Sequence, residues 1–116
     1  MSQIVRIRRT QMVEREHLLQ ALTDSGQAWV EGGQVRGRSV DIKLKGQGIG
    51  FRKGKGSYSV ISDRRVGSKR VAELTRQLTK RYIYLVTREK LEAQGFTLAS
   101  EVEEEGKVHL VLRRMT

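Results

Sequence analysis

The sequence has no cysteine, no proline and only two histidines, His17 and His109. The lack of cysteine excludes disulfides, zinc ribbons and thiol catalysis, and a metal site would have to rely on carboxylates. No apolar run approaches the roughly eighteen residues that cross a membrane. The N-terminus also lacks the apolar stretch of a signal peptide. We therefore expect a soluble protein without a membrane partner, located in the cytoplasm or, if encoded in an organelle, in the plastid stroma or its nucleoid equivalent.

Catalytic motifs are also lacking. No serine has an adjacent histidine and acid to activate it. The glycine-rich stretch 46–56 has neither the spacing of a phosphate-binding loop nor the dinucleotide pattern. His17, beside Glu14 and Glu16 on a short helix, and His109, on a closing strand, are interpreted as solvated or partly packed. The sequence therefore predicts a protein that is not an enzyme, with no catalytic residues, no metal ligands and no cofactor.

The length of 116 residues predicts a single domain over residues 1–116. Hydrophobic periodicity predicts an α+β fold, in which an antiparallel sheet packs against a short N-terminal helix and one long helix. The expected elements, in order, are a strand at 4–9, a helix at 13–25 closed by Gly26, short strands at 28–31 and 34–36, a three-stranded meander over 39–62, a helix at 68–94 that Gly95 ends, and a hairpin of strands 97–102 and 107–113 with glutamates 103–105 at its tip. In the meander, alternation predicts Val40, Ile42 and Leu44 on the inner face, with Lys43 and Lys45 on the outer face.

Positive charge is concentrated in one part of the chain. Residues 34–70 contain eleven basic and only two acidic residues, so they carry +9 of the total charge of +10. Such a cationic block indicates a surface that binds a polyanion. We refer to it as the basic block, and its members are the candidate nucleic-acid-binding residues: Arg36, Arg38, Lys43, Lys45, Arg52, Lys53, Lys55, Arg64, Arg65, Lys69 and Arg70. Because alternate residues of neighbouring strands share a side of a sheet, we expect these charges to form one patch.

Other interpretations of the block remain open. Its lysines are also compatible with solvated hairpin turns, and the cations around residue 68 lie where a helix N-terminus attracts anions. Trp29, Phe51 and Tyr58 could stack on bases as in single-strand binders, although core packing is the simpler interpretation. The glutamates at 103–105 are typical of a solubilising tip, or of a surface that pairs with a basic partner.

Several phrases in order resemble a known family. They are Val35-Arg36-Gly37, Ile49-Gly50-Phe51-Arg52-Lys53 with Tyr58-Ser59-Val60, the segment 78–84, Ala93-Gln94-Gly95-Phe96, and the segment 106–114. The set is similar to the hypothetical chloroplast reading frame thirty-five family, which comprises small plastid, cyanobacterial and bacterial proteins of unknown function. The resemblance implies little about activity, but it points to a multi-protein assembly, because bacterial members are often described near AAA-type ATPases.

Two functions follow as expectations. The first is a non-enzymatic RNA- or DNA-binding domain that contacts phosphates through the basic block. The alternative is a protein-interaction subunit of a larger assembly, with an AAA-type ATPase as a candidate partner. In that case the sheet edge or basic face would dock an acidic partner, or the acidic tip would dock the basic block of a second copy.

Overall fold

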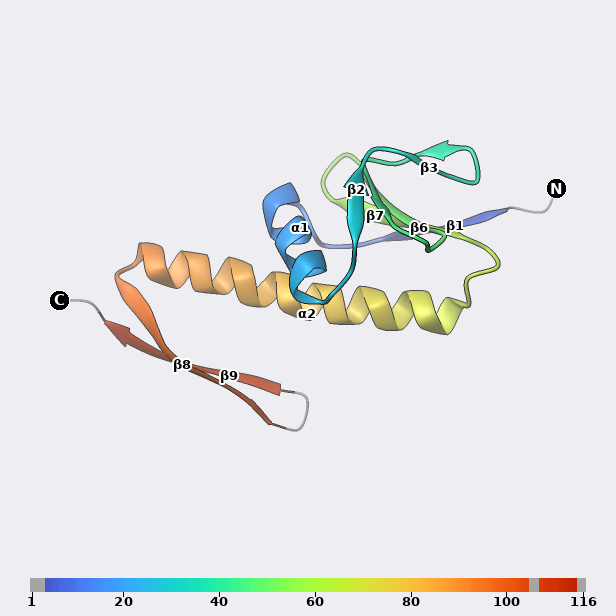
Figure 1. Cartoon of the computed structure of the whole chain (residues 1–116). Helices are drawn as coiled ribbons and strands as arrows, with labels where there is room; N and C mark the ends of the chain where they lie inside the picture. The colour runs from blue at the N-terminus through green and yellow to red at the C-terminus, as the bar shows by residue number, and fades with distance from the viewer. Residues whose placement is uncertain (1–3, 105–106, 115–116) are drawn as a thin grey trace. The chain divides into compact units, whose positions relative to one another are not determined.

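The structure is a computed structural model that describes residues 4–104 and 107–114, with side chains described for residues 4–96 (Figure 1). The chain contains two helices and nine strands in the described residues. In order they are β1 (Val5–Arg9), α1 (Arg15–Asp24), β2 (Trp29–Glu31), β3 (Gln34–Val35), β4 (Arg38–Ser39), β5 (Ile42–Leu44), β6 (Ile49–Lys53), β7 (Tyr58–Asp63), α2 (Ser68–Ala93), β8 (Phe96–Glu104) and β9 (Lys107–Arg114). The predicted α+β class is confirmed. The predicted order of elements also holds, except that the first expected strand of the meander is divided into β4 and β5.

The chain divides into two compact units within α2. Residues up to Tyr82 form the first unit, and residues from Ile83 onward form the second. The prediction of a single domain over residues 1–116 stays a prediction.

The first unit is built on a five-stranded antiparallel sheet with the strand order β1-β7-β6-β5-β2. One face of this sheet, which we call the Phe51 face, carries Ile42, Leu44, Phe51 and Val60, all essentially inaccessible to solvent. Strand alternation gives all four residues the same side, because Ile42 and Val60 are both register partners of Phe51. This face therefore supplies the sheet's half of the main core.

Helical side chains supply the other half of the core. Leu18, Ala21 and Leu22 of α1 are fully buried, at the spacing of three and four residues that gives a helix one apolar side. The helix stops where Gly26 adopts a φ of +76°, and Gln27 N–H donates to Leu22 O at 2.9 Å, as the sequence predicts for a left-handed cap. In α2, Val71, Leu74, Leu78 and Tyr82 are buried with the same periodicity.

The opposite face of the sheet, which we call the Gly50 face, is partly covered by the β3–β4 hairpin. Val35 and Val40 from the hairpin segment pack with Val5 and Ile61 of the sheet in a small apolar cluster. A Cβ added to Gly50 would lie 2.8 and 2.9 Å from the two methyl carbons of Val40, so only glycine allows this close packing. Figure 1 shows β3 on the side of the sheet away from the start of α2.

The position of Val40 corrects one sequence-based prediction. Val40 packs on the Gly50 face, whereas Ile42 pairs with Phe51 and faces the opposite side. The chain bends at Asp41, whose N–H donates to Phe51 O at 2.8 Å although Ile42 is the register partner of Phe51. Two residues thus oppose one, as in a β-bulge, and the alternation restarts after it.

The second unit contains the end of α2 and the β8–β9 hairpin. Gly95, with a φ of +93°, ends the helix as predicted. Strands β8 and β9 form a separate two-stranded antiparallel sheet with an irregularity between Leu98 and Ser100. Part of the expected acidic tip, residues 105–106, lies outside the described residues. No helix in the described part of the chain is long and apolar enough to span a membrane.

Candidate nucleic-acid interface

The Gly50 face gathers part of the basic block. Lys43 is the register partner of Gly50, and Arg52 is two residues from Gly50 on the same strand, so both side chains belong to this face. Arg36 and Arg38 lie on the β3–β4 hairpin that packs against the same face, and both are exposed. The predicted single patch is therefore present in part, built from β4, β5, β6 and the hairpin turn.

Lys53 belongs elsewhere. It follows Arg52 on β6 and therefore points to the Phe51 face, where its ammonium group lies 5.0 Å from the centre of the Tyr58 ring. Its Nζ also donates to Val13 O, and its backbone N–H donates to the Asp41 carboxylate at 2.6 Å. Lys53 thus tethers the segment before α1 to the sheet, which gives this lysine a structural reason to be present.

Asp63 neutralises two arginines of the block. Its carboxylate lies 3.0 Å from the Arg65 guanidinium and 3.7 Å from that of Arg36, and it also accepts the Arg65 backbone N–H at 2.9 Å. The hydrogen bonds from the Arg65 side chain hold the pKa of Asp63 below its ordinary value. Since this acid is ionised near neutral pH, it would repel a phosphate approaching the same spot.

Asp63 also borders an open hollow of about 380 Å³ at the end of the sheet where β7 finishes. The hollow is lined by Lys43, Gly46, Gln47, Gly48, Asp63, Arg65 and Val66. A Cβ on Gly48 would lie 2.7 Å from the Cβ of Asp63, so glycine is required where the turn before β6 approaches the end of β7. With one carboxylate beside one lysine and one arginine, the hollow carries mixed charge and is not a simple anion cradle.

The turn after β7 and the start of α2 carry Arg64, Lys69 and Arg70, whereas Lys45 follows β5 and Lys55 lies between β6 and β7, both exposed. Arg70 donates to the side-chain oxygen of Gln47, whose amide nitrogen in turn donates to Gln27 at 2.8 Å. Arg64 and Lys69 are exposed on either side of the turn that leads into the helix. These residues extend the cationic surface beyond the Gly50 face to the helix N-terminus.

Six members of the basic block have no hydrogen bond or ion pair from their side chains within the described part of the chain. They are Arg38, Lys43, Lys45, Arg52, Lys55 and Lys69. Five of them are exposed and Lys43 is half-buried. Because such groups are not engaged in the fold, an external anion could bind them without breaking an internal contact. We call these six residues the unpaired cations.

Arg9 was missed by an interpretation confined to residues 34–70. It is the register partner of Ser59, which is itself the partner of Arg52, so Arg9 and Arg52 lie on the same face two strands apart. That separation is about 10 Å between the backbones. The alternation of residues 4–9 shows which face of the strand Arg9 occupies, but it does not show that this strand pairs with β7.

Arg36 has an unusual backbone. It is the one non-glycine residue with a positive φ, +51°, in the described part of the chain, and the next residue, Gly37, has a φ of +83°. Two left-handed residues make the tight turn that suits the twist of a two-stranded hairpin, and asparagine, aspartate and glycine are the usual occupants. An arginine in this conformation costs roughly 1–2 kcal/mol, so its presence calls for a reason outside local stability.

The aromatic residues do not form a stacking platform on the Gly50 face. Phe51 and Tyr58 are buried on the opposite, helix-covered side of the sheet, which is the core interpretation of the sequence. Trp29 is half-buried, and its indole N–H donates to the Thr23 hydroxyl at 3.2 Å. The interface offered to a polyanion is therefore mainly cationic, and contacts to phosphates fit it better than stacking of bases.

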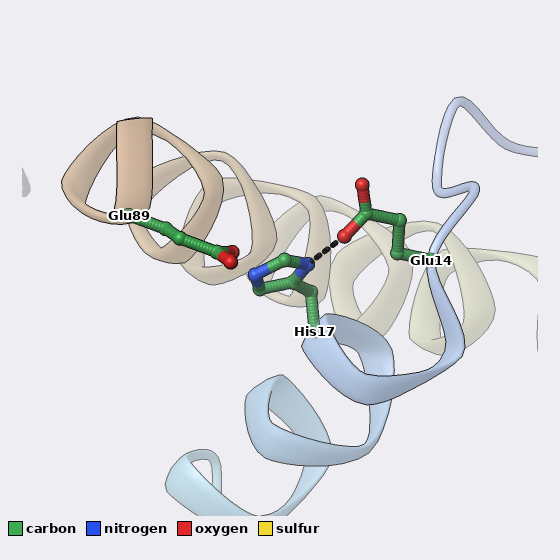
Figure 2. Close-up of side chains that lie close together, drawn as sticks. All are labelled: Glu14, His17 and Glu89. Carbon is green, nitrogen blue, oxygen red and sulfur yellow. Dashed lines mark ion pairs between the residues drawn. The ribbon is translucent and has the colours of Figure 1, made fainter. Parts of the chain in front are cut away.

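His17 is engaged by its neighbours. Figure 2 shows the imidazole Nδ1 facing the Glu14 carboxylate, with which it forms an ion pair when protonated. The ring meets the edge of Tyr82 at 5.9 Å between centres. The Tyr82 hydroxyl accepts the backbone N–H groups of Val13 and Glu14, each at 2.9 Å, which fastens the start of α1 to α2. His17 is half-buried, consistent with the expected partly packed histidine, whereas the side chain of His109 lies outside the described residues.

Fold and site together define a small α+β protein with a cationic surface on one side of its sheet. The chain belongs to the family described as "Protein of unknown function (DUF1257)", which it matches over residues 18–111. Comparison with curated proteins gave no match, and comparison with solved structures gave none either.

Proposed function

We propose that this protein is a non-enzymatic nucleic-acid-binding protein that contacts the phosphates of RNA or DNA through the Gly50 face, the β3–β4 hairpin and the adjoining turns. The observation that carries the proposal is the set of six unpaired cations within a block that holds +9 of the total charge. Most protein–nucleic acid hydrogen bonds go to phosphates and sugars, and lysine and arginine supply many of them.

Two further observations support the proposal. Arg36 keeps a left-handed backbone at the tip of an exposed hairpin, where the turn itself favours glycine or asparagine and where its side-chain contact is the 3.7 Å approach to Asp63. The neighbouring Arg38 is exposed and unpaired. Both residues sit on a hairpin held against the sheet by Val35 and Val40, so the charges are presented by a well-packed element.

The expected salt dependence follows from the number of unpaired cations. Neutralising six phosphates releases condensed counterions, so log K should fall with log salt at a slope of about −4 to −5. A protein partner with a few charged contacts would give a gentler slope. The slope therefore separates a polyanion surface from an ordinary protein-docking surface.

The test is a titration of labelled single- and double-stranded RNA and DNA at several salt concentrations. The main variant replaces four unpaired lysines with glutamine, in the combination Lys43→Gln, Lys45→Gln, Lys55→Gln and Lys69→Gln. Loss of four phosphate contacts should reduce the magnitude of the slope by about 3 to 4. Lys53 is left unchanged, because its tethering role would confuse binding with folding.

The matched control removes the same charge outside the basic block. It combines Arg15→Gln, Arg76→Gln, Lys80→Gln and Lys90→Gln. Under the proposal this control keeps most of the wild-type slope. Equal losses in the two variants would show that net charge alone attracts the polymer, and a dissociation constant weaker than about 10⁻⁴ M near physiological salt would refute the proposal. The assembly alternative would then account better for the cationic surface.

We also propose that this member of the family corresponds to the hypothetical chloroplast reading frame thirty-five group. The support is the run of resembling phrases, several of which are structurally demanding. Val35-Arg36-Gly37 makes the left-handed turn, and the segment beginning Ile49-Gly50-Phe51 is β6, with the glycine that Val40 packs against.

A further inference from the structure

The five-stranded sheet has two edges, and they differ in length. The edge strand β2 has only three residues, and its Glu31 is bound by Arg15 at 2.7 Å. The edge strand β1 has five residues, pairs with β7 without a register shift and carries the exposed side chains of Ile7, Arg8 and Arg9. A short edge resists the addition of another strand, whereas a longer regular edge can accept one.

The ladder identifies which β1 groups face outward. Arg64 N–H donates to Ile4 O at 3.0 Å, and Thr10 N–H donates to Tyr58 O at 3.1 Å, so the hydrogen-bonded positions at the two ends are both even-numbered. Hydrogen-bonded and non-bonded pairs alternate in an antiparallel ladder. Arg6 and Arg8 therefore bond to β7, and Val5, Ile7 and Arg9 turn their N–H and C=O groups toward the free edge.

Two features that commonly prevent the addition of a strand, proline and a β-bulge, are lacking at this edge. The chain has no proline, and the described ladder of β1 has no bulge. What remains is charge, because three of the five residues of β1 are arginine. Ile7, the central residue, is 58% exposed and Ile4 is 48% exposed, so an added strand would also gain apolar contact.

The arginines make the edge selective. A second copy of β1 paired antiparallel about Ile7 would put Arg6 opposite Arg8, and like charges directly opposite each other are destabilising. An extended segment with carboxylates at the same positions would instead form favourable cross-strand pairs. Charge therefore disfavours this self-pairing and favours a strand of opposite charge.

We propose that β1 is a docking edge for an acidic, extended segment of a partner protein, which adds to the sheet as a sixth strand beside β1. Backbone hydrogen bonds to Val5, Ile7 and Arg9 hold the segment, and Ile7 contacts apolar residues on one face of it. Arg8 selects carboxylates on the other face, beside Arg6, whose guanidinium also donates to Val66 O at 2.7 Å. This edge adjoins the proposed phosphate surface, because Arg9 lies on the Gly50 face with Arg52, but it engages backbone groups that the phosphate surface does not use. Neither proposal depends on the other being correct.

The test uses a synthetic peptide of alternating glutamate and valine, about eight residues long, which is the length of an ordinary strand. Amide hydrogen exchange of the full chain is measured by NMR with and without the peptide. In the free protein, the Arg6 and Arg8 amides should be protected by β7 and the Ile7 and Arg9 amides should exchange rapidly. Addition of the peptide should slow exchange at Ile7 and Arg9 by about tenfold or more.

Two peptide controls separate strand addition from charge attraction. A peptide N-methylated at alternate residues keeps its carboxylates but loses donors, and it should bind about tenfold more weakly. A peptide with lysine in place of glutamate should not protect the edge. The protein variant Ile7→Pro removes one outward N–H donor and leaves the hydrogen bonds between β1 and β7 in place. Proline is tolerated at such a position because the N–H of this edge residue faces solvent. The variant should no longer bind the peptide.

Several results would overturn the proposal. One is binding of the acidic and N-methylated peptides with equal affinity, which would mean that the cationic surface attracts them without strand pairing. Another is protection of Ile7 and Arg9 in the free protein, which would mean that the edge is already covered. If that protection rose with protein concentration, self-pairing would be the explanation. The peptide measurements stand whether or not Ile7→Pro folds.

Discussion

Gly50→Ala tests the packing that holds the β3–β4 hairpin to the sheet. The new methyl would lie 2.8 and 2.9 Å from the two methyl carbons of Val40 and 3.0 Å from Ile42 O. Comfortable carbon–carbon contacts are about 3.5–4.0 Å, so Val40 must retreat by nearly 1 Å. Overpacking of this kind costs about 1–3 kcal/mol, and we expect the free energy of unfolding to fall by that amount.

A second substitution shows whether Val40 is the cause. Val40→Ala alone removes two buried methyl groups and should cost about 2 kcal/mol. In the double variant the alanine at position 50 occupies space that Val40 has vacated. The combined cost should therefore be smaller than the sum of the single costs by about 1–2 kcal/mol.

Urea denaturation, followed by the fluorescence of Trp29 and by far-UV circular dichroism, gives the four free energies of this cycle. Gly56→Ala serves as a control, because nothing lies within 4 Å of its added Cβ, and its effect should stay within about 0.5 kcal/mol. Single costs that add to within about 0.5 kcal/mol would refute the reasoning, since they would show that the two positions do not compete for space.

Two further predictions concern polar contacts. Tyr82→Phe removes the acceptor of the backbone N–H groups of Val13 and Glu14, and it should lower the free energy of unfolding by about 1–3 kcal/mol in thermal or urea denaturation. Tyr58→Phe is the control and should cost clearly less, because the Tyr58 hydroxyl has no hydrogen bond among the described residues. The hydrogen bonds from Arg65 lower the pKa of Asp63 in the folded protein. The ionised Asp63 therefore stabilises the fold at pH values above its unfolded pKa of about 3.9. This stabilisation is lost as the pH falls through the lower pKa of the folded state. The stability advantage of wild type over Asp63→Asn should therefore shrink in urea titrations below about pH 4, and an advantage that grows with acidity would contradict the assignment.

Local sequence patterns predicted the helices and strands well. The features that they did not predict depend on how strands pair in the tertiary structure. The order of strands and helices followed from periodicity and from glycines such as Gly26 and Gly95, whose left-handed backbones end the two helices. The face of the sheet on which Val40 lies could not be predicted in this way, because a bulge at Asp41 resets the alternation of side chains and no local signal in the sequence marks that bulge.

The candidate site was predictable in composition but not in arrangement. The sequence identified all the cations of the basic block, yet it could not show that Lys53 faces the side opposite to Lys43 and Arg52, or that Asp63 neutralises Arg65. Arg9 was omitted because its place beside Arg52 depends on β1 pairing with β7, two segments some fifty residues apart.

The left-handed backbone of Arg36 allows selection for stability to be separated from selection for function. In a library randomised at position 36, sorting for resistance to proteolysis alone should enrich glycine and asparagine, which tolerate a φ of +51°. Sorting for the protein's activity in its host should instead retain arginine if the side chain is used. The difference between the two enrichments would measure how strongly function opposes the local preference of the turn, whatever molecule the hairpin binds.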